Sequence, residues 1–168
     1  LQEISELMGM DVVEAAARFI VNDDAESCMV MHEMFSEEDI AQLVAHPLSQ
    51  IGSDGIPTGN PHPRLYGTFP KFFGTYVREK KVMSWPEAVQ RVTAVPAQRI
   101  GLKGRGLIKA GYAADLVVFD PASIKDQENY INSAQAPLGI SYVFVDGVLT
   151  KAGEQVENTY PGTFLAKS

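Results

Sequence analysis

A nearly continuous apolar run over residues 27–35, SCMVMHEMF, constrains the fold of this chain more than any other stretch. Its length and its position between two helical patterns predict a strand that is buried on both faces, as strands of parallel sheets are. Such a strand needs a neighbour on each side. We therefore expect the chain either to expose an unusually large apolar surface or to cover that surface by association.

Helical patterns flank this run on both sides. Asp11 and Glu14 form a capping-box signature before the first of them, and Ser36 opens a second helix over residues 37–45. A very short strand is predicted next, from Gln50 to Gly52, and it leads into Ser53, Asp54 and Gly55. Helix, strand, helix and strand in this order are typical of a parallel sheet, so the predicted fold class is α/β.

Proline and serine residues predict three further helices. They begin at Pro70, at Ser84 and near Pro96, and the last ends before Gly101. The first of these helices carries its apolar side chains on one side: Phe72, Phe73, Tyr76 and Val77. An apolar face of this kind is expected to pack inward.

The pattern changes to a β type from Gly106 onward. Strands are predicted at four places: 107–108, 114–119, 142–145 and 148–150. Asp146 and Gly147 between the last two strands are the signal for a two-residue type I′ turn. We therefore predict a boundary near residue 105, with an α/β part over residues 1–105 and a small β part over residues 106–168.

Composition excludes several classes of protein. Lys and Arg number 14 against 21 Asp and Glu, so the net charge is -7 and no basic patch indicates nucleic-acid binding. No apolar run approaches the roughly 18 to 20 residues that a membrane-spanning helix needs. The single cysteine, Cys28, excludes an internal disulfide framework and a multi-cysteine zinc site, and it fits a reducing, cytoplasmic location. The three histidines lack the spacing of a metal motif.

Asp54 is the strongest candidate for chemistry. It follows a predicted strand directly, and ligands gather at the carboxyl ends of parallel strands. An aspartate before Gly55 also commonly binds the backbone of its own loop, so both interpretations stay open. Arg64, ten residues later, offers a planar fork of donors that suits an acidic small molecule, although a solvated loop arginine is the ordinary alternative. For His62, between two prolines, a packing or surface role is the more ordinary interpretation.

Two sets of residues resemble a known family. The residues SDG at 53–55, followed by HPRLYGTFP at 62–70, resemble a motif specific to the N-acyl-D-amino-acid deacylases, or D-aminoacylases. PAQRIGLKGRGLIKAGYAADLVVFDP at 96–121 and VFVDGVLTKAGE at 143–154 resemble segments that many metal-dependent amidohydrolases share. The resemblance covers most of the chain.

The resemblance implies a fold that is larger than these residues can form. It implies the C-terminal portion of a metal-dependent hydrolase TIM barrel, about the last two strand–helix units, followed by part of a small β-sandwich. Residues 27–35 would then be the seventh strand and Gln50 to Asp54 the eighth. The chain would be a fragment of a longer enzyme or a separate chain that another completes.

The resemblance also implies roles for individual residues. Asp54 would be the catalytic aspartate, which takes a proton from zinc-bound water and passes it to the leaving amine. Arg64 matches the position that binds the α-carboxylate of the substrate. Met34 and Phe35 would lie near the pocket for the acyl group or side chain. The zinc ligands of the family, a cysteine and histidines on earlier strands, have no counterpart here, and Cys28 is not that ligand.

The leading hypothesis is thus the end of a zinc-dependent enzyme that hydrolyses N-acyl-D-amino acids to a carboxylate and a D-amino acid. The chain by itself is expected to be inactive and to bind no catalytic metal. Its partners would be the small-molecule substrate and either the remainder of the barrel or a second copy of itself. One alternative is an amidohydrolase of cyclic amides, against which the HPRLYGTFP stretch argues. The other is a non-catalytic interaction domain, against which Asp54 and Arg64 argue.

Overall fold

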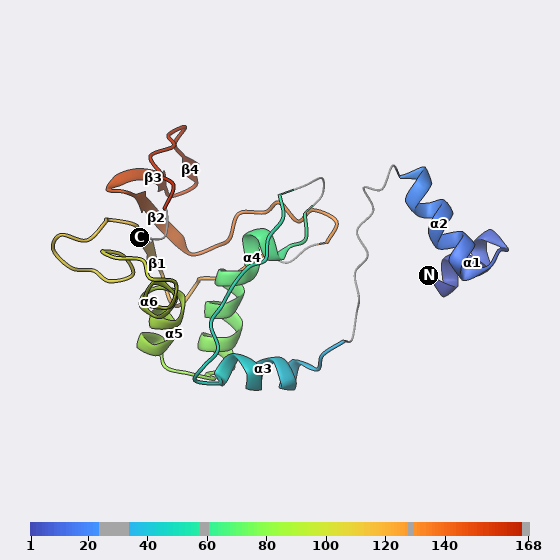
Figure 1. Ribbon diagram of the computed structural model, residues 1–168, viewed down its shortest axis with the longest axis horizontal. Coiled ribbons are helices and arrows are strands. Elements are labelled where there is room, and N and C mark those ends of the chain that lie inside the picture. The colour runs from blue at the N-terminus through green and yellow to red at the C-terminus, as the bar shows by residue number, and fades with distance from the viewer. Residues whose placement is uncertain (24–33, 58–60, 128–129, 166–168) are drawn as a thin grey trace. The chain divides into compact units, whose positions relative to one another are not determined.

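The computed structural model describes residues 1–23, 34–57, 61–127 and 130–165 (Figure 1). The chain forms two units, Leu1–Ser36 and Glu37–Ser168. Most of the strand predicted over residues 27–35 lies outside the described residues. Its last two positions, 34 and 35, form a bend.

The first unit contains two helices, α1 (Gln2–Met8) and α2 (Val12–Asn22). Asp11 caps α2, because its carboxylate accepts the backbone N–H of Val13 at 2.9 Å. Gly9 ends α1 with a φ of 61°. The helix start predicted at Asp11 is therefore confirmed.

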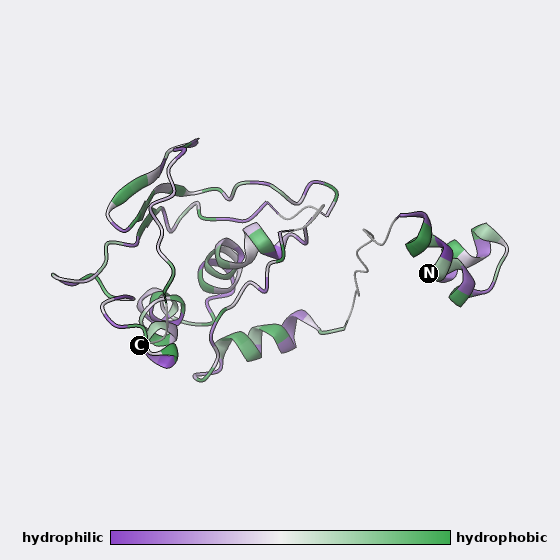
Figure 2. Cartoon of the chain, turned by 45° about the horizontal axis from the view of Figure 1, so that its top comes forward, coloured by the Kyte–Doolittle hydropathy of each residue, from purple (hydrophilic) through white to green (hydrophobic). Residues whose placement is uncertain are grey.

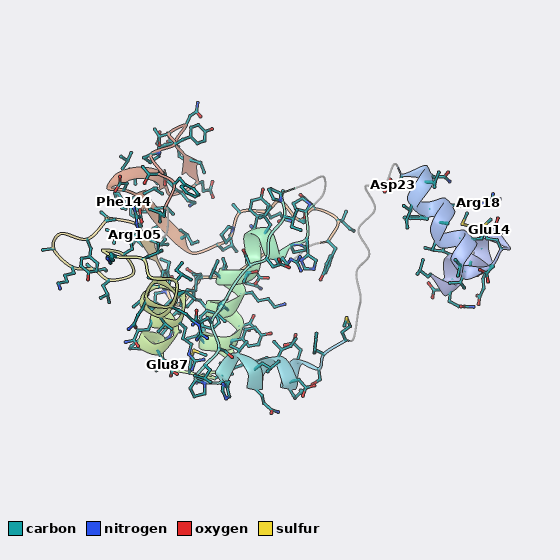
Figure 3. The ribbon with its side chains drawn as sticks, viewed as in Figure 1. Glu14, Arg18, Asp23, Glu87, Arg105 and Phe144 are labelled. Carbon is teal, nitrogen blue, oxygen red and sulfur yellow. The ribbon has the colours of Figure 1, made fainter. Side chains whose placement is uncertain are left out.

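Helix α2 is amphipathic but buries little. Ala15 is fully buried, whereas four large apolar side chains of this helix are exposed: Val13, Phe19, Ile20 and Val21. Figure 2 shows hydrophobic residues in green and hydrophilic residues in purple on the helices nearest the N-terminus. Glu14 and Arg18 lie one turn apart and form an ion pair of 3.0 Å on the surface (Figure 3). Within the first unit, the apolar side of α2 thus has too few neighbours to cover it.

The second unit begins with helices: α3 (Glu37–Ala45), α4 (Arg64–Lys71), the π-helix η1 (Phe72–Glu79), α5 (Trp85–Val92) and α6 (Ala94–Ile100). The hydroxyl of Ser84 accepts the N–H of Glu87 and caps α5, as predicted. Gly101, with a φ of 78°, ends α6, also as predicted. In the described parts of the chain, every helix is too short or too polar to cross a membrane.

The helix predicted to begin at Pro70 begins earlier, so that prediction is wrong. Pro70 is buried inside α4, which starts at Arg64. Proline lacks an N–H and crowds the carbonyl four residues before it, so it weakens the α-helical ladder at this point. From Phe72 the chain continues with wider turns, and the N–H of Lys80 donates to the oxygen of Thr75, five residues back, at 2.8 Å.

An aromatic cluster forms the core of the second unit. The ring of Phe73 on η1 stacks on Trp85 with centroids 5.7 Å apart and planes 7° apart. Phe119 lies 5.2 Å from the ring of Phe73. Ile124 is buried in the same core, and its carbonyl accepts Nη1 of Arg78 at 2.6 Å. The core therefore joins helices to residues that follow the first strand.

Arg91 of α5 satisfies the C-terminal end of α3. Its side chain is only 5% exposed. Nη1 donates to the carbonyl oxygens of Val44 and His46 at 2.9 and 2.6 Å, and Nη2 donates to Ala45 at 3.2 Å. Nη2 also pairs with Glu87 at 2.6 Å. The last carbonyls of a helix have no partner within the helix, so this guanidinium supplies what α3 lacks.

The strands form one antiparallel sheet in the order β1 (Leu116–Phe119), β2 (Ile140–Val145), β3 (Val148–Ala152) and β4 (Gln155–Val156). Asp146 and Gly147 between β2 and β3 have φ values of 49° and 81°, as a type I′ turn requires. The predicted hairpin is confirmed. Helices end at Ile100 and strands begin at Leu116, whereas the domain boundary near residue 105 stays a prediction.

Two stretches that the sequence predicts as strands form no strand in this structure, because neither finds a partner strand among the described residues. Leu107 and Ile108 lie in a loop and are 55% and 92% exposed. Gly104 and Gly106 before them have positive φ values and turn the chain away from extended geometry. Gln50 to Asp54 also runs without regular secondary structure. Apolar residues can favour a strand, but only a neighbouring strand completes one.

Candidate functional site

Asp54 occupies a strained position in the loop that leads to α4. Its φ of 46° lies in the left-handed region, which residues other than glycine seldom adopt. Gly55 follows it, and a Cβ there would lie 2.6 Å from Cδ1 of Leu65 and 2.9 Å from its Cα. The loop can approach the start of α4 this closely only because residue 55 has no side chain.

Arg64, the first residue of α4, contacts Asp54 twice. Its Nη2 lies 2.9 Å from Oδ2 of Asp54, and its Nε donates to the carbonyl oxygen of Asp54 at 2.9 Å. The Asp54 side chain is 82% exposed and that of Arg64 is 41% exposed. The structure therefore brings together two residues that the sequence predicted as catalytic and substrate-binding, and it leaves both accessible.

The N–H groups in the first turn of α4 are all paired. Arg64 donates to Nδ1 of His62 at 3.1 Å, and Leu65 donates to the carbonyl oxygen of His62 at 3.0 Å. The N–H groups of Tyr66 and Gly67 both donate to the carbonyl oxygen of Pro63. The bond from Gly67 to Pro63 is the first regular bond of the helix. The other three groups, those of Arg64, Leu65 and Tyr66, are ones that a helix cannot pair internally. His62 accepts two of them.

Tyr130 reaches this site from a distant part of the sequence. Its ring packs edge-on against His62, with centroids 5.2 Å apart and planes 88° apart. Its hydroxyl lies 3.5 Å from Nε2 of His62, although the two residues are 68 positions apart. Sequence reasoning missed Tyr130 because a single tyrosine in a loop carries no periodic signal.

A pocket of about 330 Å³ opens beside Arg64. Its polar lining includes His62, Arg64, Thr68, Lys71 and Tyr130, and its apolar lining includes Val44, Ile51 and Phe72. A volume of this size accepts a small molecule. The pocket combines cationic donors with an apolar wall, which suits a ligand that carries both a carboxylate and a hydrocarbon group.

Met34 and Phe35 belong to the first unit and not to the unit that holds the site. They are 57% and 63% exposed. The contact of these two residues with the acyl or side-chain pocket stays a prediction.

Glu37 at the start of α3 forms polar contacts with Tyr76 of η1 and with Lys80 at the end of η1, next to the pocket. Nζ of Lys80 lies 2.9 Å from Oε2 of Glu37, and this hydrogen bond lowers the pKa of Glu37. The same bond raises the pKa of Lys80. Tyr76, which lines the pocket, lies 3.5 Å from Oε2 of Glu37, and burial raises the pKa of its hydroxyl. Tyr76 therefore stays neutral at physiological pH.

Metal-ligating side chains do not converge in the described ranges. There, no three His, Cys, Asp or Glu side chains lie close enough to hold a metal ion. Asp54 is paired with Arg64 in this structure.

Known proteins match this chain over most of its length. The sequence matches the amidohydrolase family over residues 4–150. A D-aminoacylase from Alcaligenes xylosoxydans xylosoxydans is 36% identical over 169 residues, which cover 97% of this chain and 35% of that enzyme. An N-acyl-D-aspartate deacylase from the same organism is 35% identical and covers 96% of this chain and 34% of that enzyme. The chain thus spans about a third of the length of these curated relatives.

Solved structures show the same fold over the matching part. The N-acyl-D-glutamate deacylase from Bordetella bronchiseptica, complexed with zinc and a phosphonate mimic of the tetrahedral intermediate, superposes with a TM-score of 0.85 at 33% identity. The match covers 99% of this chain and 34% of that one. A crystal structure of a D-aminoacylase superposes with a TM-score of 0.81 at 32% identity and covers 96% of this chain and 33% of that one.

Proposed function

The chain belongs to the amidohydrolase family, and we propose that it provides the base and the carboxylate-binding residue of an N-acyl-D-amino-acid deacylase. The reaction is hydrolysis of an N-acyl-D-amino acid to a carboxylate and a D-amino acid. One observation carries this proposal: Asp54, in an exposed loop, pairs with Arg64 at the start of α4, and Arg64 lines a pocket, so a carboxylate and an anion-binding group lie together. The names of the relatives support the substrate class.

The proposed fold is the end of a TIM barrel followed by part of a β-sandwich. Residues 27–35 and 50–54 would be its last two strands. The lack of a partner for residues 50–54 in the described ranges supports this, because a strand that pairs only with the missing remainder would look the same. The exposed apolar side of α2 supports it too, since the remainder of a barrel would cover such a face.

In the proposed mechanism, Arg64 leaves the carboxylate of Asp54 and binds the α-carboxylate of the substrate. Its guanidinium now holds Oδ2 of Asp54, and a substrate α-carboxylate presents the same chemical group to the same donors. Once Arg64 binds the substrate, the carboxylate of Asp54 is released from its cationic partner. Asp54 then accepts a proton from the attacking water and delivers it to the leaving amine.

The described residues do not form a zinc site. The sequence holds one cysteine and three histidines in all, and the described part brings no ligand set together. A zinc ion like that of the related N-acyl-D-glutamate deacylase would need ligands beyond those that the described residues bring together. We accordingly expect the 168 residues by themselves to turn over no substrate.

A chimera tests the proposal. The matching third of the Alcaligenes D-aminoacylase is replaced by these 168 residues, and hydrolysis of N-acyl-D-amino acids is measured with the N-acyl-L-amino acids as controls. We expect D-selective hydrolysis by the chimera and none by the 168-residue chain with added zinc. A folded chimera with full zinc content and no activity on any N-acyl-D-amino acid would contradict the proposal and favour a non-catalytic interaction domain.

A further inference from the structure

We infer that His62 is a positioning residue that fixes Arg64 at the site through the lone pair of its Nδ1 atom; the catalytic part of this inference rests on the proposed function. The N–H of Arg64 donates to that atom at 3.1 Å. Arg64 in turn makes both contacts with Asp54. A hydrogen bond at its backbone therefore holds the residue whose guanidinium meets the aspartate.

The hydrogen bond specifies the chemical form of the His62 ring. An atom that accepts an N–H cannot carry a proton, so Nδ1 is unprotonated and the neutral ring carries its proton on Nε2. Nε2 is the atom that faces the hydroxyl of Tyr130 at 3.5 Å. The two sides of the imidazole thus have different partners, one on α4 and one in a segment far along the chain.

The surroundings of His62 restrict its movement. Pro61 and Pro63 fix φ on either side, which stiffens the backbone. The ring is half-buried, and Tyr130 packs edge-on against it at 5.2 Å. A ring held this way keeps Nδ1 aimed at the first turn of α4, whereas an isolated loop histidine would rotate freely.

Asparagine and glutamine at position 62 separate this role from simple packing. The side-chain oxygen of asparagine accepts a backbone N–H two residues on, which is the same geometry that Nδ1 of His62 makes with Arg64. Glutamine is one carbon longer and does not close that turn. H62N therefore keeps an acceptor for the N–H of Arg64. H62Q keeps a side-chain amide but does not place its oxygen at that N–H, and H62A has neither the amide nor the acceptor.

Two measurements test the inference. The first is hydrogen exchange of the Arg64 amide in the 168-residue chain, with the Tyr66 and Gly67 amides as internal references because they pair with Pro63. We expect exchange at Arg64 to rise about tenfold in H62Q and H62A and to change less than about twofold in H62N. The second is steady-state kinetics of the chimera, where H62Q should raise KM several-fold with a smaller change in kcat, and H62N should restore KM.

Each outcome decides one point. Equal exchange rates at Arg64 in H62N and H62Q would overturn the role of Nδ1. Faster exchange at all three amides would show general fraying of α4 and would also overturn it. If the Arg64 amide exchanged at different rates in H62N and H62Q but the two chimeras had the same KM, the effect of His62 on substrate binding would be refuted. An inactive wild-type chimera would contradict the proposed function, while the exchange rates would still decide whether His62 holds Arg64.

Discussion

Arg64 contacts Asp54 through the carboxylate and through the backbone at once, with both distances at 2.9 Å. The first contact depends on the charge of the aspartate, and the second does not. A substitution that removes the charge but keeps the shape should therefore leave Arg64 near its place. This separates the chemistry of Asp54 from its structural role.

Asp54→Asn should lower kcat of the chimera by about 10²- to 10⁴-fold with little change in KM, because the amide cannot accept the proton that a general base takes. Steady-state kinetics with the metal content confirmed as unchanged are the measurement. Glu154→Gln, an exposed acidic residue between β3 and β4, is the control. An Asp54→Asn enzyme with nearly full kcat would remove Asp54 from the mechanism.

Arg64→Lys should act mainly on KM. A lysine keeps the charge but offers a point charge in place of a planar fork, so one of the two directed contacts with a carboxylate is lost. We expect KM to rise by about ten- to a hundredfold, as the loss of one charged hydrogen bond implies. Arg18→Lys, in the exposed pair on α2, should leave KM unchanged. A larger fall in kcat than rise in KM would assign Arg64 a different role.

Gly55→Ala should disturb the site, and Gly52→Ala should not. The new methyl group at position 55 would meet Leu65 at 2.6 Å and push the loop away from α4. At position 52 nothing lies within 4 Å, so the same substitution in the same loop is a matched control. We expect Gly55→Ala to reduce the free energy of unfolding by about 1–3 kcal/mol, measured by urea denaturation. Equal stability of the two variants would contradict the close approach of the loop to Leu65.

Arg91→Met should cost more stability than any surface substitution. Methionine fills a similar space but removes the donors that Arg91 gives to the carbonyl oxygens of Val44 and Ala45, whereas that of His46 keeps the N–H of Ser49. We expect a loss of about 2–3 kcal/mol in the free energy of unfolding, from the loss of charged hydrogen bonds in a buried place. Arg99→Met on α6 is exposed and should change stability by less than about 0.5 kcal/mol. Similar urea midpoints for the two variants would show that Arg91 does not support α3.

The Glu37–Lys80 pair should make stability depend on pH. The lowered pKa of Glu37 means that the folded chain releases its proton more readily than the unfolded chain does. The stabilisation is therefore complete above the ordinary glutamate pKa and is lost as pH falls through the lowered pKa. The difference in unfolding free energy between wild type and Lys80→Met should accordingly shrink at acid pH, with Lys103→Met as the control. A difference that stays constant down to acid pH would contradict this linkage.

Local signals in the sequence predicted much of the fold. Asp11 and Ser84 mark helix starts within three residues of the N–H groups that they accept, and Asp146 and Gly147 supply the two positive φ values of one turn. Each signal depends on a few neighbouring residues, so it can be recognised from the sequence alone. Asp54 and Arg64 are separated by only ten residues and lie in the stretches at 53–55 and 62–70 that resemble one family motif. Their proximity could therefore be expected from the sequence.

Contacts between distant residues were beyond the reach of such signals. Arg91 pairs with carbonyls some 45 positions away, and Tyr130 reaches His62 across 68. Proline is common in the first turn of helices, so Pro70 indicates a helix start. The helix begins at Arg64 instead, because His62 and Pro63 accept the N–H groups of its first turn. Apolar content alone could not tell which runs would find a partner strand.

The shared aromatic cluster has a consequence for how this chain can vary. Phe73 and Trp85 come from the helical part and Phe119 from the first strand, and the three rings lie within 6.0 Å of one another. A change in ring size on one side of residue 105 leaves a void or a clash on the other. Substitutions at Phe73 or Trp85 should therefore be accompanied by compensating substitutions at Phe119. A chimera that joins the two parts from different homologues should need ring sizes that match across this cluster.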